Sequence, residues 1–134
     1  MAYTGAIHGF PDASYIAEAD FAQHQVAKLG TGDNGVTPAG AGEAGIGIAQ
    51  NAVDVSARDT HVTIRRGGFS LATAGTGGWT KGDYLKVDAS GNLIVQAGAT
   101  DLCVAIAQET VAATEKGEVL ILPTPIEYSA VDGA

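Results

Sequence analysis

Residues 78–95 constrain the fold more than any other stretch, because they predict a complete β-hairpin. Leu85 and Val87 alternate with polar neighbours at the period of two that is typical of a strand with one buried face. Residues 88–92 supply turn chemistry, since Gly91 can take a positive φ and the neighbouring Asp, Ser and Asn side chains can bond nearby backbone groups. The hairpin favours a β-rich fold over a helical one.

Trp79 directly precedes the predicted strands and is the only tryptophan of the chain. A tryptophan offers about 150–250 Å² of surface to bury and one polar tip, so it fits the end of a core or an interface. We name Trp79 as a candidate for a subunit interface, with core packing as the alternative.

Most of the remaining sequence also predicts short strands. With 19 glycines and few long helix-forming runs, the composition favours strands joined by tight turns. Proline cannot donate to a strand ladder, so Pro123 and Pro125 are expected to stop the last strand. The segments that predict strands are residues 25–29, 45–50, 60–65, 69–72, 102–108 and 118–122.

A chain of 134 residues fits one domain of ordinary size. We predict an all-β fold, a compact β-barrel or sandwich over residues 21–134, with a short C-terminal tail after Pro125. Residues 1–20 mix isolated aromatic side chains with Gly and Pro, which favours an extended arm that docks over a disordered terminus. Residues 48–53 resemble residues 106–111, and a second strand follows each, which suggests a pseudo-symmetric core.

The net charge of −8 disfavours nucleic acid and anionic lipid as partners, because both would be repelled. A single cysteine, Cys103, excludes an intrachain disulfide and fits a small buried residue. The sequence has neither an apolar run long enough to span a bilayer nor the basic and apolar regions of a signal peptide. We therefore expect no membrane partner and synthesis in the cytoplasm.

Motifs that would carry chemistry are weak or missing. The three histidines have no metal-ligand spacing, and residues 88–92 lack the bidentate Glu of a calcium loop. No Gly-x-Ser-x-Gly elbow occurs, and the glycine-rich loops do not precede a predicted helix that could bind phosphate. Lys116 lies at a hairpin tip like the modified lysine of carrier domains, but without their flanking residues, so a solvated turn explains it better. We expect no enzyme activity and no cofactor.

Arg65 and Arg66 form the only basic pair in this acidic chain. Charged side chains can protect the edge of a strand against aggregation. Arginine also pairs well with carboxylates, so the doublet could instead contact an acidic patch on a partner. The residues leave both interpretations open.

The order of these short β motifs resembles that of the small capsid decoration, or cement, proteins of tailed bacteriophages. The likeness covers roughly residues 20–123. It rests on residues 37–43 and 45–50, on residues 62–69 and 82–91, and on the closing strands at residues 104–108 and 119–122.

The resemblance implies a non-enzymatic protein with a tulip-like β-barrel and an N-terminal arm. It implies binding to the outer surface of an expanded head, as homotrimers at three-fold positions that bridge major capsid protein subunits, and hence a location in the virion. A clip of this kind stabilises the closed shell by binding it better than the separated subunits. The candidate capsid contacts are Tyr3, Ile7, Phe10 and Tyr15 in the arm, with Arg65 and Arg66.

Two other classes remain open. A spike or fibre-attachment module would bind a receptor or glycan, or occur in a fixed low copy number, whereas a cement protein would occur in many copies. A small β-barrel carrier domain would need a modified Lys116 or a polar pocket.

Overall fold

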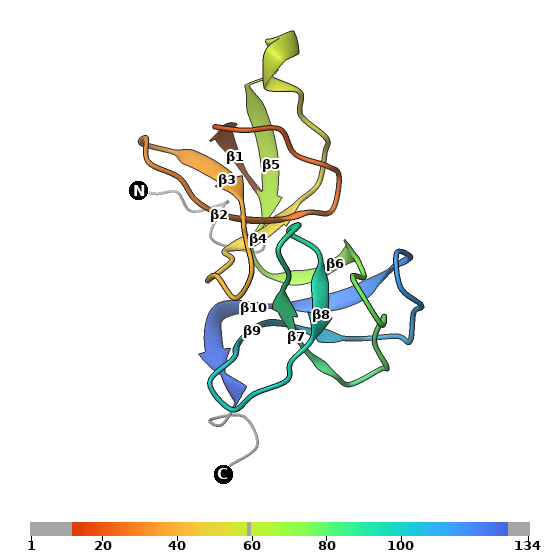
Figure 1. Cartoon of the computed structure of the whole chain (residues 1–134). Coiled ribbons are helices and arrows are strands. Elements are labelled where there is room, and N and C mark those ends of the chain that lie inside the picture. Colours follow the sequence, from red (N-terminus) through yellow and green to blue (C-terminus); the bar gives the residue numbers. More distant parts are fainter. Residues whose placement is uncertain (1–11, 59, 129–134) are drawn as a thin grey trace.

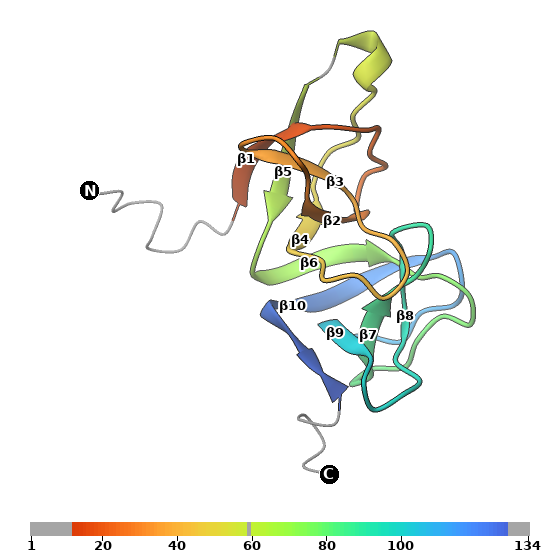
Figure 2. The same cartoon turned by 60° about the vertical axis from the view of Figure 1, so that its left-hand side comes forward.

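The computed structural model describes residues 12–58 and 60–128, and it confirms the predicted all-β class (Figure 1). The strands form two sheets, which Figures 1 and 2 show one above the other. We call them the first unit and the second unit. The first unit contains β1 (Asp12–Ala17), β2 (Val26–Leu29), β3 (Gly35–Pro38), β4 (Gly47–Ala49) and β5 (His61–Arg65). The second contains β6 (Gly68–Thr73), β7 (Tyr84–Val87), β8 (Leu93–Val95), β9 (Leu102–Ala107) and β10 (Lys116–Glu127).

The first unit is a closed barrel with the strand order β1-β3-β2-β4-β5. Its β1 pairs in parallel with β3 and antiparallel with β5, which closes the sheet on itself. In β5 the side chains of Val62 and Ile64 point into the core, as the alternation of this segment predicts. Gly47 in β4 lies so close to the carbonyl of Arg65 that a side chain there would collide with it, so the backbones of β4 and β5 pack closely at this point.

The second unit is an antiparallel sheet with the order β6-β10-β9-β7-β8. An isolated parallel bridge between Ala74 and Leu93 joins the chain after β6 to β8. The sheet therefore curls toward closure between the same two positions that β1 and β3 join in the first unit. A core of small and branched residues fills it, including Leu85, Leu93 and Val119, each 0% exposed.

The two units are topological copies of each other. The backbones of Phe21 and Val53 exchange two hydrogen bonds of 2.9 Å, and those of Trp79 and Val111 exchange bonds of 3.0 and 3.1 Å. The glutamine of each echoed motif also repeats its contact.

Gln50 Nε2 donates to the carbonyl of Ile48 at 3.0 Å, and Gln108 Nε2 donates to that of Ile106 at 3.2 Å. The sequence echo is thus confirmed as part of a duplicated fold.

The predicted hairpin is also confirmed, as β7 and β8. Asp88 Oδ1 accepts from the amides of Ser90 at 2.8 Å and Asn92 at 2.9 Å, and Gly91 takes a φ of 79°. This is the turn that the sequence predicts. The hairpin lies at the end of the strand order of the second unit.

Two predicted boundaries are wrong. The second half of the predicted arm, residues 12–17, is strand β1, which closes the first unit by pairing with β5. At the other end, β10 continues to Glu127 instead of stopping at the prolines. A register shift between Ile121 and Ile126 interrupts the pairing with β9, and the prolines lie within it, where no amide is needed for the ladder.

Candidate functional site

An apolar junction joins the two units. Val26 and Ile48 are each only 2% exposed, although they lie on the outer side of the first unit. They belong to the same core cluster as residues of the second unit, and they line a small pocket together with Leu93, Val104 and Ile121. The junction is therefore a continuous part of the core.

Backbone contacts reinforce this junction. The amide of Val26 donates to the carbonyl of Gly91 at 2.9 Å, and Gln25 Nε2 donates to that of Ser90 at 2.7 Å. The amide of Gly42 donates to the carbonyl of Val87 at 3.0 Å. The first unit therefore contacts the second unit at the β7–β8 turn and at the end of β7.

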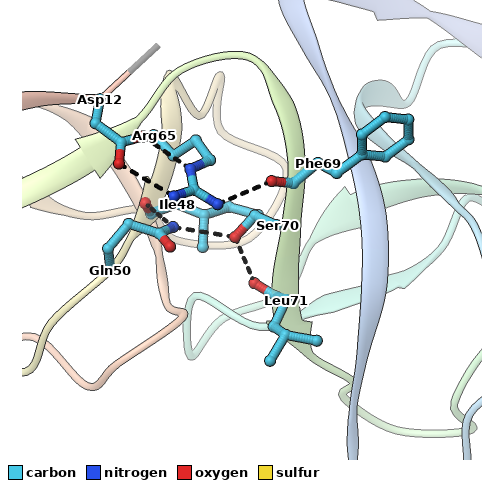
Figure 3. A network of polar contacts seen from close by, with 7 residues as sticks. All are labelled: Asp12, Ile48, Gln50, Arg65, Phe69, Ser70 and Leu71. Carbon is cyan, nitrogen blue, oxygen red and sulfur yellow. Dashed lines mark hydrogen bonds and ion pairs between the residues drawn. The ribbon is translucent and has the colours of Figure 1, made fainter. Parts of the chain in front are cut away.

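A polar network lies beside the apolar contact (Figure 3). Gln50 Nε2 also donates to Ser70 Oγ at 3.0 Å, and this hydroxyl donates to the carbonyl of Leu71 at 2.8 Å. Arg65 Nη1 donates to the carbonyl of Phe69 at 3.0 Å, while the ring of Phe69 points away from the network.

Arg65 also pairs with Asp12 through two contacts. Its Nε lies 2.7 Å from Oδ1, and its Nη2 lies 3.1 Å from Oδ2. The hydrogen bond from Arg65 holds the pKa of Asp12 below its usual value, and the carboxylate raises the pKa of Arg65 in return. This guanidinium is therefore engaged within the chain. It does not protect a strand edge, because β5 is paired with β1 on one side and with β4 on the other.

His24 and Lys116 form a further contact between the units. Lys116 Nζ lies 2.9 Å from His24 Nδ1 and 3.3 Å from the carbonyl of Gln23. Burial lowers the pKa of His24, and the positive charges of Lys116 and Arg65 lower it further. The Nδ1 atom of a neutral imidazole accepts a hydrogen bond from the ammonium group here, so Lys116 bridges the units in addition to beginning β10.

The outer face of the second unit carries exposed apolar side chains. Phe69 pairs with Leu120, Leu120 pairs with Ile106, and Ile106 pairs with Tyr84, so the four side chains form one row across four strands. Phe69 is 54% exposed, and the other three are half-buried. Beside this row, Leu71 is 44% exposed.

Sequence reasoning missed this surface. A signal was present in residues 69–72, where Phe69 and Leu71 alternate with the small residues Ser70 and Ala72. The large residues point outward and the small ones inward, which is the reverse of a usual half-buried strand. A contiguous apolar area on a surface often marks an interaction site.

The residues predicted to contact the capsid differ in their surroundings. Tyr3, Ile7 and Phe10 lie outside the described residues. Tyr15 is only 8% exposed and lies in the first core, so the prediction that it is an exposed anchor is wrong. Arg66 is exposed, and its Nη1 donates to the Tyr15 hydroxyl at 2.9 Å.

Trp79 packs in the core of the second unit and is 3% exposed. Its Nε1 donates to the carbonyl of Glu109 at 2.8 Å. The subunit-interface assignment is therefore wrong, because the chain itself already covers this side chain. The alternative, packing within a core, is what the structure shows.

Among residues 12–58 and 60–128, no group of three or more His, Cys, Asp or Glu side chains is arranged to hold a metal ion. The same described part contains no helix with the length and apolar character needed to cross a membrane.

The fold defines an all-β protein made of two topologically equivalent five-stranded units. Among solved structures, it is similar to the head fiber gp8.5 N base of bacteriophage phi29, with a TM-score of 0.68 and 15% sequence identity. The match covers 87% of this chain and 97% of that chain, so the two share a fold over nearly their whole length. No protein-family model and no curated protein sequence matches this chain.

Proposed function

We propose that this chain is a non-enzymatic structural protein of a tailed bacteriophage, which attaches to the outer surface of the head as the base of an appended structure. The observation that carries the proposal is the shared fold with the phi29 head fiber base over 97% of that chain. The exposed apolar row of the second unit supports a role in binding and assembly.

The proposed partner is the major capsid protein, with self-association into homotrimers. The proposed capsid contacts are Tyr3, Ile7 and Phe10, which precede β1, together with the exposed Arg66. Several linked copies would convert a modest affinity at one site into strong avidity.

Co-sedimentation with expanded and unexpanded heads tests this proposal. Removing residues 1–11 should abolish binding to expanded heads while the unfolding of the core stays unchanged, because β1 begins only at Asp12. A matched control replaces Val55, an exposed residue in the 3₁₀ turn Val55–Ala57, with Ser. Full-length protein that fails to sediment with either form of head would contradict capsid attachment, and unchanged binding of the shortened protein would contradict the contact assignment.

A cement protein remains the second candidate, since the order of the short β motifs resembles that family. Copy number separates the two functions. Many copies over the whole head favour cement, and a fixed low number favours the base of a fibre. Binding to a purified glycan or host receptor would instead indicate an adhesive module.

A further inference from the structure

The duplicated fold gives each position of the first unit an equivalent in the second. The row Asp12, Arg65, Ile48 and Val26 crosses the first unit through the same pairings that join Phe69, Leu120, Ile106 and Tyr84 in the second. We call these the first row and the second row.

The first row lies along the junction with the second unit. Arg65 bonds the carbonyl of Phe69, Val26 bonds the carbonyl of Gly91, and Ile48 packs in the shared core. The second row has the same position on its own unit, but the described chain covers it far less. Within this part of the chain, the ring of Tyr128 packs edge-on against Tyr84 in the row, with ring centroids 6.1 Å apart.

The surface of the second unit that the first unit contacts at the junction also has an equivalent in the first unit. In the second unit it includes Val87, which is 1% exposed because the loop around Gly42 and Gly45 lies over it. The pairing of Val87 with Leu93 matches that of Leu29 with Val36, so Leu29 is its equivalent in the first unit. Leu29 is 62% exposed. We call the parts of the two units around these two residues the Val87 surface and the Leu29 surface.

Within residues 12–58 and 60–128, one half of each duplicated surface is therefore engaged and the other half is open. The first row is engaged and the second row is open. The Val87 surface is engaged and the Leu29 surface is open. Both open halves present large apolar side chains, which are costly to leave in water.

We propose that the second row of one copy packs against the Leu29 surface of the next copy, so that the junction within the chain is repeated between chains. The contact is heterologous, because two different surfaces meet, and it closes a ring when the rotation between copies divides a full turn. This inference rests on the self-association in the proposed function and names the surfaces that would form it.

Two charged variants separate the halves of this contact. F69E places a carboxylate in the second row, and L29E places one in the opposite surface; both positions are exposed, so the fold should tolerate them. Light-scattering mass, measured over a range of concentrations, should show an oligomer for the unmodified protein and a monomer for each variant. V55E, on an exposed residue of the 3₁₀ turn, is the matched control and should stay oligomeric.

Mixing the variants gives the sharper test. L29E keeps an intact second row and F69E keeps an intact Leu29 surface, so one of each should form a dimer and nothing larger. An isologous contact between two second rows would leave L29E oligomeric, and that result would overturn the proposal. So would a monomeric unmodified protein at every concentration, or a mixture that forms no dimer.

Thermal unfolding identifies any variant that fails to fold, and L29S and F69S then replace it in the same measurements. The experiment uses isolated protein, so its failure is distinct from failure of capsid attachment. An unmodified protein that stays monomeric but still binds heads would contradict this inference alone. An unmodified protein that self-associates but does not bind heads would contradict capsid attachment in the proposed function and leave this inference standing.

Discussion

Val26 and Ile48 are each 2% exposed in the first unit, whereas their equivalents in the second unit, Tyr84 and Ile106, are half-buried on an outer face. The strand order and pairing around the two pairs are the same. The exposed fractions differ because the second unit covers Val26 and Ile48. Burial at these positions therefore depends on the neighbouring unit rather than on the local fold.

The outer halves of the two rows differ in chemistry. The first unit has the ion pair Asp12–Arg65, and the second unit has the apolar pair Phe69–Leu120 in the same register. Exposed ion pairs contribute little stability, about 0–1 kcal/mol, but each charge has its partner within the chain. The apolar pair has no such partner within the described chain, which is why it marks the open surface.

The largest expected effects come from the two core aromatics at equivalent positions. Trp79→Ala and Phe21→Ala should each lower the free energy of unfolding by about 3–5 kcal/mol, because both side chains are 3% exposed and leave a cavity. Urea unfolding followed by circular dichroism measures the loss. Since the junction shares one core cluster, each variant should shift a single transition. Two separate transitions, with only one shifted by each variant, would show that the units fold independently.

A second pair of variants tests the difference in burial between the two rows. Ile48→Ala should cost about 2–5 kcal/mol of unfolding free energy, because a buried aliphatic side chain is removed. Ile106→Ala, at the equivalent position, is the matched control and should cost less in the monomer, because this side chain is already partly in water. Equal losses would contradict the inequivalence of the two rows. A larger loss for Ile106→Ala at high protein concentration only would support cover by another copy.

Much of the fold could be predicted because several strands alternate clearly. Val62 and Ile64, and likewise Leu85 and Val87, point inward as predicted. Strand β1 was missed because only Tyr15 and Ala17 of its six residues are buried, too few to show a period. The end of β10 was missed because a register shift cannot be read from a sequence.

The candidate surface could not be predicted for a different reason. A strand with Phe69 and Leu71 on one face and Ser70 and Ala72 on the other has two plausible inner faces. Hydrophobicity alone favours burying the large residues, but the interior of the second unit has room only for the small ones, and Ala72 is 0% exposed. Trp79 shows the converse, since a residue suited to an interface lies in the core.

The smallest expected effect concerns His24, which contacts Lys116 across the junction. The equivalent of His24 in the second unit is Gly82, which has no side chain to titrate. The folded-state pKa of His24 is lowered from 6.5, so below this value the unfolded chain takes up a proton that the folded chain resists. Stability should therefore fall as the pH drops below about 6.5 and level off below the folded pKa. His24→Asn is the matched variant, because asparagine tolerates the φ of 70° at this position and does not titrate. Urea midpoints measured from pH 7 down to about 5 should decline more for the unmodified protein than for the variant. Parallel declines would remove His24 as the source and leave the junction independent of pH in this range.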